Sequence, residues 1–288
     1  MNGVLNLNKE KYISSFGAVA KVRKLANTKK VGHTGTLDPL ATGVLPICIG
    51  KATKIADYIM EDNKTYKTTL KLGFTSDTYD KEGTIIKTSD ILPNSEDVIE
   101  CINTFIGEIH QIPPMYSAIK VNGKKLYELA RQGIEIERKS RLINIYNIEI
   151  LKIDLPYVEF AVDCSKGTYI RSLCYDIGNK LGCGAIMWEL QRTKTGSFSI
   201  ENSNLLNELD TENIEEHLIS IEDALSKFHK FNFDKRYENA LLNGVKIRDE
   251  NLLLNFKENN LYRIYIDNLF IGIGRKNKEY FSIVKLLI

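Results

Sequence analysis

The sequence predicts an α+β fold, in which a large sheet with flanking helices is followed by a small β-rich domain. Two patterns support this: runs that alternate apolar and polar residues, as in half-buried strands, and runs whose apolar residues recur at helical spacing. After residue 230 the pattern changes to short strands separated by turns. The chain has 288 residues, and single cores rarely grow beyond about 250 residues. We therefore expect a large domain at 1–230 and a small domain at 231–288.

The first elements are a short apolar strand and a helix with one basic face. The strand is expected at residues 4–7, and Ser14 or Ser15 is expected to cap the helix. The apolar residues of the helix are Ala18, Val19, Val22, Leu25 and Ala26. Basic residues lie on its other face and just beyond it: Lys21, Arg23, Lys24, Lys29 and Lys30. The ordinary interpretation of such a cluster is a solvated helix face.

Residues 31–54 form the most unusual segment, a glycine-rich and proline-rich loop that runs into a strand. It is not a nucleotide-binding P-loop, because six residues separate Gly43 from Gly50 and an alanine follows Lys51. Asp38 precedes a proline, which restricts its backbone and favours a rigidly presented carboxylate. An Asx turn explains Asp38 equally well, and His33 alone is typical of an ordinary loop or core histidine.

The remaining elements follow from local patterns. Strands are expected at 66–74, 142–153 and 157–164, and Tyr66 points to the apolar face of the first of these. Helices are expected at 95–106 with Ser95 as the cap, at 169–181 with Arg171 off the buried stripe, and at 213–227 as an acidic amphipathic helix. Between them, residues 112–133 contain Asn122 followed by Gly123, a strong hairpin signal, and then a short helix.

The bulk composition excludes several classes of protein. The five cysteines are scattered and never form a CxxC pair, which argues against a disulfide framework and against a zinc site. No apolar run approaches the roughly 20 residues that span a bilayer, and the first residues lack the apolar core of a signal peptide, so we expect a cytoplasmic protein. The net charge is only +2, so nucleic-acid binding does not follow from charge.

Five stretches of the chain, in the same order, resemble the TruB family of tRNA pseudouridine-55 synthases. They are GHTGTLDPLATGVLPICIGKATK at 32–54, KTYK at 64–67, IPPMYSAIKVNGKKLYELARQG at 112–133, CSKGTYIRSL at 164–173 and LGCGAIMWELQRTKTGSF at 181–198. This resemblance implies a large mixed, mainly antiparallel sheet with flanking helices, of pseudouridine synthase type. The C-terminal part resembles that family's small PUA-like RNA-binding domain more weakly.

The resemblance also implies roles for single residues. Asp38 matches the catalytic aspartate, and Arg171 matches the arginine that pairs with it and favours its ionised form. Tyr66 matches a tyrosine that lies against the target base and is implicated in removing the proton from carbon 5, although a core tyrosine fits its strand pattern equally well. Tyr169 and Leu190 match positions that line the uracil pocket. His33 matches a residue that contacts the RNA beside the extruded nucleotide.

The 112–133 stretch matches an insertion that closes over the RNA, so its basic residues are candidates for backbone phosphate contacts: Lys120, Lys124, Lys125 and Arg131. The cluster at residues 21–30 gains the same interpretation less firmly. Gln191 departs from the family, because many relatives have a basic residue there, before Arg192. This puts one phosphate contact in doubt. The other departure is the short C-terminal domain, which is expected to bind the acceptor end of tRNA less strongly.

The predicted function is isomerisation of uridine 55 in the T loop of tRNA by base flipping, cleavage of the glycosidic bond and bond formation at carbon 5 of uracil. Asp38 is the expected catalytic carboxylate, and attack on ribose, attack on uracil and sugar deprotonation all remain open to it. We expect an isomerase that acts on the tRNA T arm as a monomer, with no metal and no cofactor. A binding protein that has lost catalysis, and a hydrolase that releases free uracil, are the alternatives.

Overall fold

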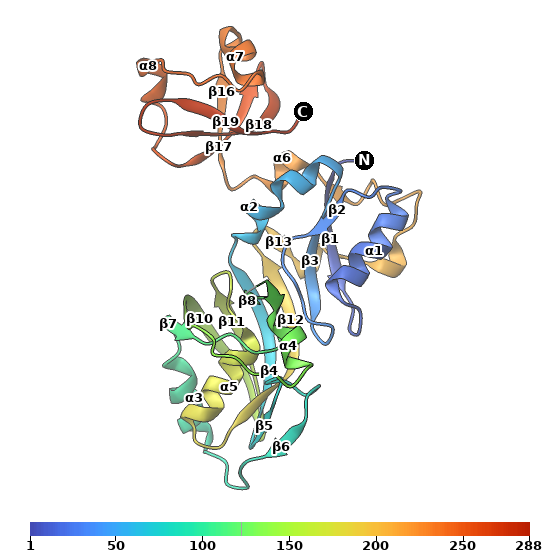
Figure 1. Ribbon diagram of the computed structural model, residues 1–288, viewed down its shortest axis with the longest axis vertical. Helices are drawn as coiled ribbons and strands as arrows, with labels where there is room; N and C mark the ends of the chain where they lie inside the picture. Colours follow the sequence, from blue (N-terminus) through green and yellow to red (C-terminus); the bar gives the residue numbers. More distant parts are fainter. Residues whose placement is uncertain (122) are drawn as a thin grey trace.

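The computed structural model describes residues 1–121 and 123–288, so that Asn122, the first turn residue of the expected hairpin, lies outside the described residues. A long sheet with helices beside it occupies most of the molecule, and a small lobe with the C-terminus lies at one end (Figure 1). This arrangement matches the predicted α+β class.

The described residues contain one 11-stranded sheet, whose main path runs β14-β1-β3-β12-β4-β11-β10-β7. Its strands are β1 (Gly3–Lys9), β2 (Val31–His33), β3 (Thr42–Ile49), β4 (Lys64–Leu72), β7 (Gly107–Gln111), β10 (Arg141–Asp154), β11 (Tyr157–Cys164), β12 (Ala185–Thr195), β13 (Phe198–Ser199), β14 (Asn204–Leu205) and β15 (Leu218–Ile219). The pairs β1 with β14 and β12 with β3 are parallel, whereas the other pairs are antiparallel. The expected mixed, mainly antiparallel sheet is thus confirmed.

Helices cover this sheet and connect its strands. Those of the large lobe are α1 (Ser15–Leu25), α2 (Ala56–Met60), α3 (Ser95–Asn103), α4 (Leu126–Ala130), α5 (Ile170–Lys180) and α6 (Ile221–Ala224). Short hairpins are formed by β5 (Phe74–Ser76) with β6 (Ile85–Lys87), and by β8 (Lys120–Val121) with β9 (Lys124–Lys125). Short 3-10 helices lie at Gly50–Ile55, Ile200–Asn202, Leu206–Glu208 and Lys235–Tyr237. Among the described residues, none of the helices has the length and apolar character needed to cross a membrane.

One large apolar core joins the helices to the sheet. The buried faces of α1, α3 and α5 pack in the same cluster as apolar residues of β1, β3, β4, β10, β11 and β12. The five cysteines are all free and buried, so they serve as core residues, as their spacing predicted: Cys48, Cys101, Cys164, Cys174 and Cys183. Burial raises the pKa of the Cys48, Cys164 and Cys174 thiols to about 12.

The small lobe is built on a four-stranded sheet with the order β16-β17-β18-β19. Its elements are β16 (His229–Phe233), α7 (Glu238–Leu242), α8 (Glu250–Leu253), β17 (Leu261–Ile266), β18 (Leu269–Lys276) and β19 (Phe281–Leu286). A second apolar cluster, which we call the shared cluster, joins this lobe to the large one. In it Ile273 and Leu287 of the small lobe pack with Ile55 and Ile59 of the large lobe.

Two local predictions were wrong. Helix α3 begins at Ser95, but the capping side chain is Asn94, whose Oδ1 accepts a hydrogen bond of 2.8 Å from the backbone N–H of Asp97. The acidic helix expected at 213–227 is reduced to the single turn of α6, which Ser220 caps. Just before that turn, β15 pairs with the free edge of β1, so the sheet and not a helix satisfies its backbone groups.

Candidate active site

The loop between β2 and β3 presents Asp38 on a rigid support. Leu37 and Leu40, on either side of it, are 3% and 1% exposed and anchor the loop in the core. The Ser15 hydroxyl accepts a bond of 2.8 Å from the Leu37 N–H and donates one of 2.9 Å to the Leu37 carbonyl. The Asp38 side chain remains 35% exposed.

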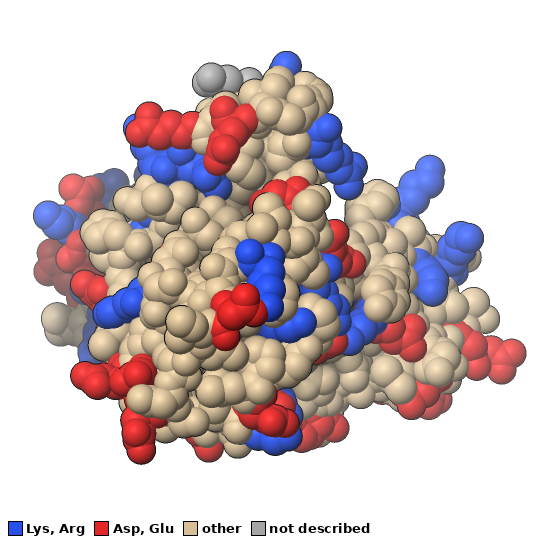
Figure 2. All heavy atoms as spheres, turned by 90° about the horizontal axis from the view of Figure 1, so that it is seen from below, with Lys and Arg blue, Asp and Glu red and all other residues tan. Residues whose placement is uncertain are grey.

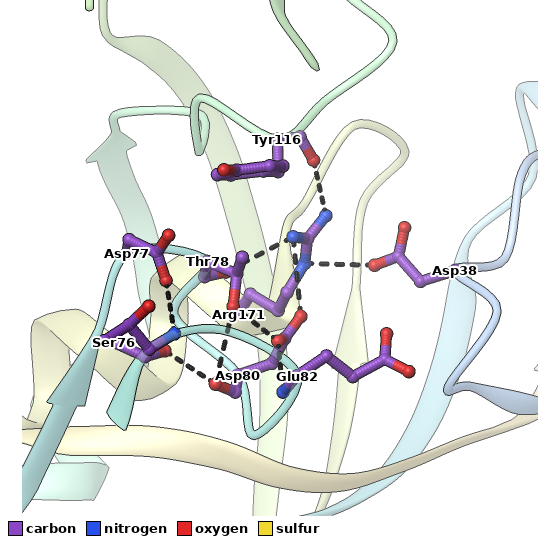
Figure 3. Close-up of polar contacts among 9 residues, drawn as sticks. Asp38, Ser76, Asp77, Thr78, Asp80, Glu82, Tyr116 and Arg171 are labelled. Carbon is purple, nitrogen blue, oxygen red and sulfur yellow. Dashed lines mark hydrogen bonds and ion pairs between the residues drawn. The ribbon is translucent and has the colours of Figure 1, made fainter. Parts of the chain in front are cut away.

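Arg171, in the first turn of α5, is the centre of the polar network (Figure 3). Its Nε lies 3.0 Å from Oδ2 of Asp38, and its Nη1 lies 3.5 Å from Oδ2 of Asp80. The same guanidinium donates to the carbonyl of Thr78 at 3.2 Å and to that of Tyr116 at 2.8 Å. Arg171 is only 6% exposed, so one buried side chain ties together the Asp38 loop, the turn after β5 and the insertion.

Asp80 is a site residue that the sequence did not reveal. It is 3% exposed, and its Oδ1 accepts bonds from the Thr78 hydroxyl at 2.6 Å and the Glu82 N–H at 3.0 Å. Burial raises the pKa of Asp80, and the bond from Thr78 and the charge of Arg171 oppose that shift. No motif marks this acidic residue in the sequence, because its importance comes from contact with a side chain far along the chain.

A cavity of about 320 Å³ adjoins this network. Its lining includes five residues that the sequence analysis assigned to the site: Asp38, Tyr66, Tyr169, Arg171 and Leu190. They come from the Asp38 loop, β4, α5 with the residue before it, and β12. Ser117 and Ala118 of the insertion also line the cavity. The volume is at the lower end of the range for small-molecule pockets, large enough for one nucleobase.

The other predicted site residues lie outside the lining of this cavity. His33 is half-buried on β2, where its Nδ1 accepts a bond of 3.3 Å from the Gly35 N–H. Burial and the charge of Arg192 lower the pKa of His33. Of the basic residues of the insertion, Lys120, Lys124 and Arg131 are exposed and Lys125 is half-buried. The Lys125 Nζ and the Arg131 guanidinium each lie 5.4 Å from the centre of the Tyr127 ring.

Charge is mixed over the molecular surface. On the face shown in Figure 2, lysine and arginine side chains lie among aspartate and glutamate side chains rather than in one patch of a single sign. This agrees with the net charge of +2. Any attraction for a polyanion therefore depends on local groups of basic side chains.

Two buried cations, Lys64 and Arg192, line the cavity, and the sequence predicts no role for either. Lys64 donates to the Met60 carbonyl at 2.5 Å, and burial with the nearby Arg192 charge lowers its pKa to about 8. Arg192 is 1% exposed and donates to the carbonyls of Val44 at 2.7 Å and Gly35 at 3.2 Å. Both residues stand in motif stretches next to site residues, which was the available signal. The described residues include no group of three or more side chains placed to ligate a metal.

This arrangement suits chemistry on a neutral ring attached to an anionic chain. A partly exposed carboxylate, held by a buried guanidinium, lines a small cavity together with a phenol and several apolar side chains. The carboxylate can act as a nucleophile or a base, while the ring enters the cavity. The buried cations make the wall electropositive, which favours a phosphate-bearing substrate.

Comparison with known proteins agrees with this geometry. Residues 23–170 match the model for the TruB family pseudouridylate synthase N-terminal domain, and residues 171–227 match the tRNA pseudouridylate synthase B C-terminal domain. The proteins named tRNA pseudouridine synthase B from Clostridium tetani and Clostridium acetobutylicum are 60% and 54% identical over the full length of both chains. Among solved structures, a Cbf5-Nop10-Gar1 complex contains a chain with a TM-score of 0.75 and 26% identity, covering 99% of this chain and 85% of that one. The chain therefore belongs to the TruB family of pseudouridine synthases and is an isomerase.

Proposed function

We propose that the protein converts uridine 55 in the T loop of tRNA to pseudouridine, with Asp38 as the catalytic carboxylate. One observation supports this above all. The Asp38 carboxylate is paired with Arg171 at 3.0 Å beside a cavity that Tyr66, Tyr169 and Leu190 also line. The relatives named tRNA pseudouridine synthase B support tRNA as the substrate.

The cavity dimensions indicate how the uridine is reached. A stacked base inside the T loop cannot enter a pocket of about 320 Å³, so the nucleotide must leave the stack first. Tyr169 and Leu190 then line the uracil pocket, and Asp38 at its mouth stands near the ribose. Attack on ribose, attack on uracil and sugar deprotonation all begin from the ionised carboxylate that the Arg171 guanidinium favours.

The remaining contacts serve to bind the RNA. Lys120, Lys124, Lys125 and Arg131 contact backbone phosphates when the insertion lies over the T arm, and His33 contacts the RNA beside the extruded nucleotide. The region 231–288 acts as a PUA-like RNA-binding domain next to a catalytic domain at 1–230. The protein works as a monomer and without a cofactor, because the isomerisation has no cosubstrate and no leaving group.

An assay on an unmodified tRNA transcript tests this function. After incubation with the protein, carbodiimide treatment and reverse transcription should give one new stop in the T loop, one nucleotide 3′ of position 55. A transcript with cytidine at position 55 is the matched control and should give none. The mass of the RNA should not change. Release of free uracil would identify a hydrolase, and binding without any stop would identify a protein that has lost catalysis.

A further inference from the structure

Arg192 is a buried cation without an anionic partner. It is 1% exposed, and the two ion pairs at the cavity, to Asp38 and Asp80, both belong to Arg171. Within the described part of the chain Arg192 takes part in no ion pair. A buried charge is costly unless something neutralises it. An anion that forms or binds during the reaction is therefore the expected partner.

The backbone holds Arg192 in one place. Strand β12 carries it between β3 and β4, where it pairs with Gly43 on one side and with Tyr66 on the other. Gly43 has a φ of +102°, and a Cβ there would lie 2.2 Å from the Arg192 carbonyl oxygen, so only glycine permits this approach. With Val44 and Gly35 accepting from its Nε and Nη2, the guanidinium is fixed before any substrate arrives.

Several ionisable groups lie near Arg192, namely Lys9, His33, Lys64, Cys164 and Tyr66. Of these, the phenol of Tyr66 lines the cavity and becomes an anion when it loses its proton. Tyr66 and Arg192 are cross-strand partners, their side chains lie on the same face of the sheet, and both line the cavity. Burial raises the pKa of Tyr66, and the charge of Arg192 opposes that shift. The charged side chains that share the cavity wall are Lys64, Lys166, Asp38 and Arg171.

The proposed reaction needs a base in this position. Once carbon 5 of uracil has bonded to the ribose, that carbon still bears its hydrogen. At this stage the ring has a double bond between C6 and N1. When the hydrogen leaves as a proton, the electron pair of the C5–H bond forms the C5–C6 double bond. The π electrons of the C6–N1 double bond then move to N1. N1 takes up a proton, so none is gained or lost overall. A neutral phenol accepts a proton poorly, whereas a phenolate accepts it readily.

We propose that Arg192 is a positioning residue that stabilises the phenolate of Tyr66, so that Tyr66 can take the proton from carbon 5. This inference rests on the proposed function. It gives the unpaired guanidinium a partner that exists only during the reaction, and it explains how a buried tyrosine can act as a base.

The test uses single-turnover reactions with tRNA that has either hydrogen or deuterium at carbon 5 of its uridines. In Arg192→Gln we expect product formation to be about tenfold to hundredfold slower, because general-base catalysis is weakened. The ratio of hydrogen to deuterium rates should rise above that of wild type, because removal of this hydrogen becomes the slow step. Arg192→Lys keeps the charge and should give an intermediate ratio.

A rescue experiment separates this role from a purely structural one. Fluorotyrosine at position 66 is a more acidic phenol and should restore part of the rate lost in Arg192→Gln. The inference would be overturned if both Arg192→Gln and Arg192→Lys were slower but kept the wild-type isotope ratio, and if fluorotyrosine restored no activity. Weaker tRNA binding with an unchanged isotope ratio would instead assign Arg192 to a phosphate. Failure of the proposed function is distinct, because wild type itself would then give no pseudouridine.

Discussion

At the scale of single residues, Arg171 does more than neutralise Asp38. Its planar guanidinium serves four acceptors from three segments, at distances from 2.8 to 3.5 Å. A point charge cannot satisfy such a set, because it lacks the fixed directions of the five N–H donors. The position of the Asp38 carboxylate therefore depends on the shape of this side chain as well as on its charge.

Asp38→Asn should abolish pseudouridine formation and leave tRNA affinity within a few-fold of wild type. The change removes the charge and preserves the shape, so the loop anchored by Leu37 and Leu40 should be unaffected. We expect the single-turnover rate to fall by more than about 10³-fold, within the range that catalytic proton transfer or covalent catalysis contributes. Substantial residual turnover would refute the assignment of Asp38.

Arg171→Lys should slow the reaction by at least about 10²-fold, because a misplacement of about 1 Å costs that much in rate. Lysine cannot reach Asp38, Thr78 and Tyr116 at once. The rate is measured under single-turnover conditions with saturating enzyme. Lys180→Arg, an exposed change in the last turn of the same helix, is the control and should leave the rate unchanged. Near-normal turnover in Arg171→Lys would mean that the Asp38 contact is unimportant.

At the scale of elements, the insertion between β7 and β10 has two sides. A backbone carbonyl contacts the candidate active site, and two lysine side chains are exposed to solvent. The Tyr116 carbonyl accepts from Arg171, while Lys120 and Lys124 flank the hairpin turn and are exposed. RNA bound at these lysines would therefore lie one short segment away from the pair of Asp38 and Arg171.

Replacing Lys120, Lys124 and Lys125 with alanine should weaken tRNA binding at moderate salt and flatten its salt dependence. Each lost phosphate contact should reduce the slope of log affinity against log salt by roughly 0.7–0.9. The choice of uridine should not change, because phosphate contacts position the RNA and do not read its sequence.

The matched control for this triple variant is replacement of Lys87 and Lys152 with alanine. These exposed lysines already pair with Asp90 and Asp154. Titrations across a salt series should show a flatter slope for the insertion variant only. An unchanged slope would mean that the insertion lysines are ordinary solvated side chains that contact no phosphate.

Helix α5 provides a prediction about pH. Burial raises the pKa of Asp176 from 3.8 to about 6, so the folded protein binds this proton more tightly than the unfolded chain. Its contribution to stability therefore falls as pH rises from about 4 to about 6 and stays unfavourable above that. Asp176→Asn should be about 1–2 kcal/mol more stable at pH 7, a value reduced for partial exposure, and close to wild type at pH 4. Urea unfolding at both pH values measures this, and equal stabilities at pH 7 would contradict it.

The elements that sequence predicted well are those whose signals are local. Strand alternation placed Tyr66 on the buried face of β4, and the spacing of apolar residues defined α1 and α5. The short α6 was mistaken for a longer helix because pairing with the β1 edge overrides helical periodicity. Asp80 and Arg192 were not predicted as site residues because their partners lie far away in the sequence, on other strands and loops.

At the scale of the whole molecule, the two lobes have separate cores but meet in the shared cluster. Ile264 belongs to the core of the small lobe, whereas Ile273 packs with Ile55 and Ile59 of the large lobe. A hydrogen bond of 3.0 Å from Lys54 to the Leu286 carbonyl supports the same junction. The small lobe therefore also covers apolar surface of the large lobe.

Ile273→Ala and Ile264→Ala should differ in how far their effects extend. Both residues are fully buried, and each change should cost the small lobe about 2–5 kcal/mol. Only Ile273→Ala should also lower the melting temperature of the large lobe, because Ile55 and Ile59 lose cover. Differential scanning calorimetry resolves the two transitions. Equal effects of both variants on the large lobe would contradict this description of the junction.

The burial of all five cysteines makes the native protein a convenient host for site-specific probes. Only a thiolate reacts with maleimide dyes, and burial keeps the Cys48, Cys164 and Cys174 thiols protonated, with pKa values near 12. Burial also raises the pKa of Cys101 and Cys183. A single cysteine introduced on the outer side of the insertion would therefore be the one fast-reacting thiol, and its fluorescence could follow RNA docking without a cysteine-free background.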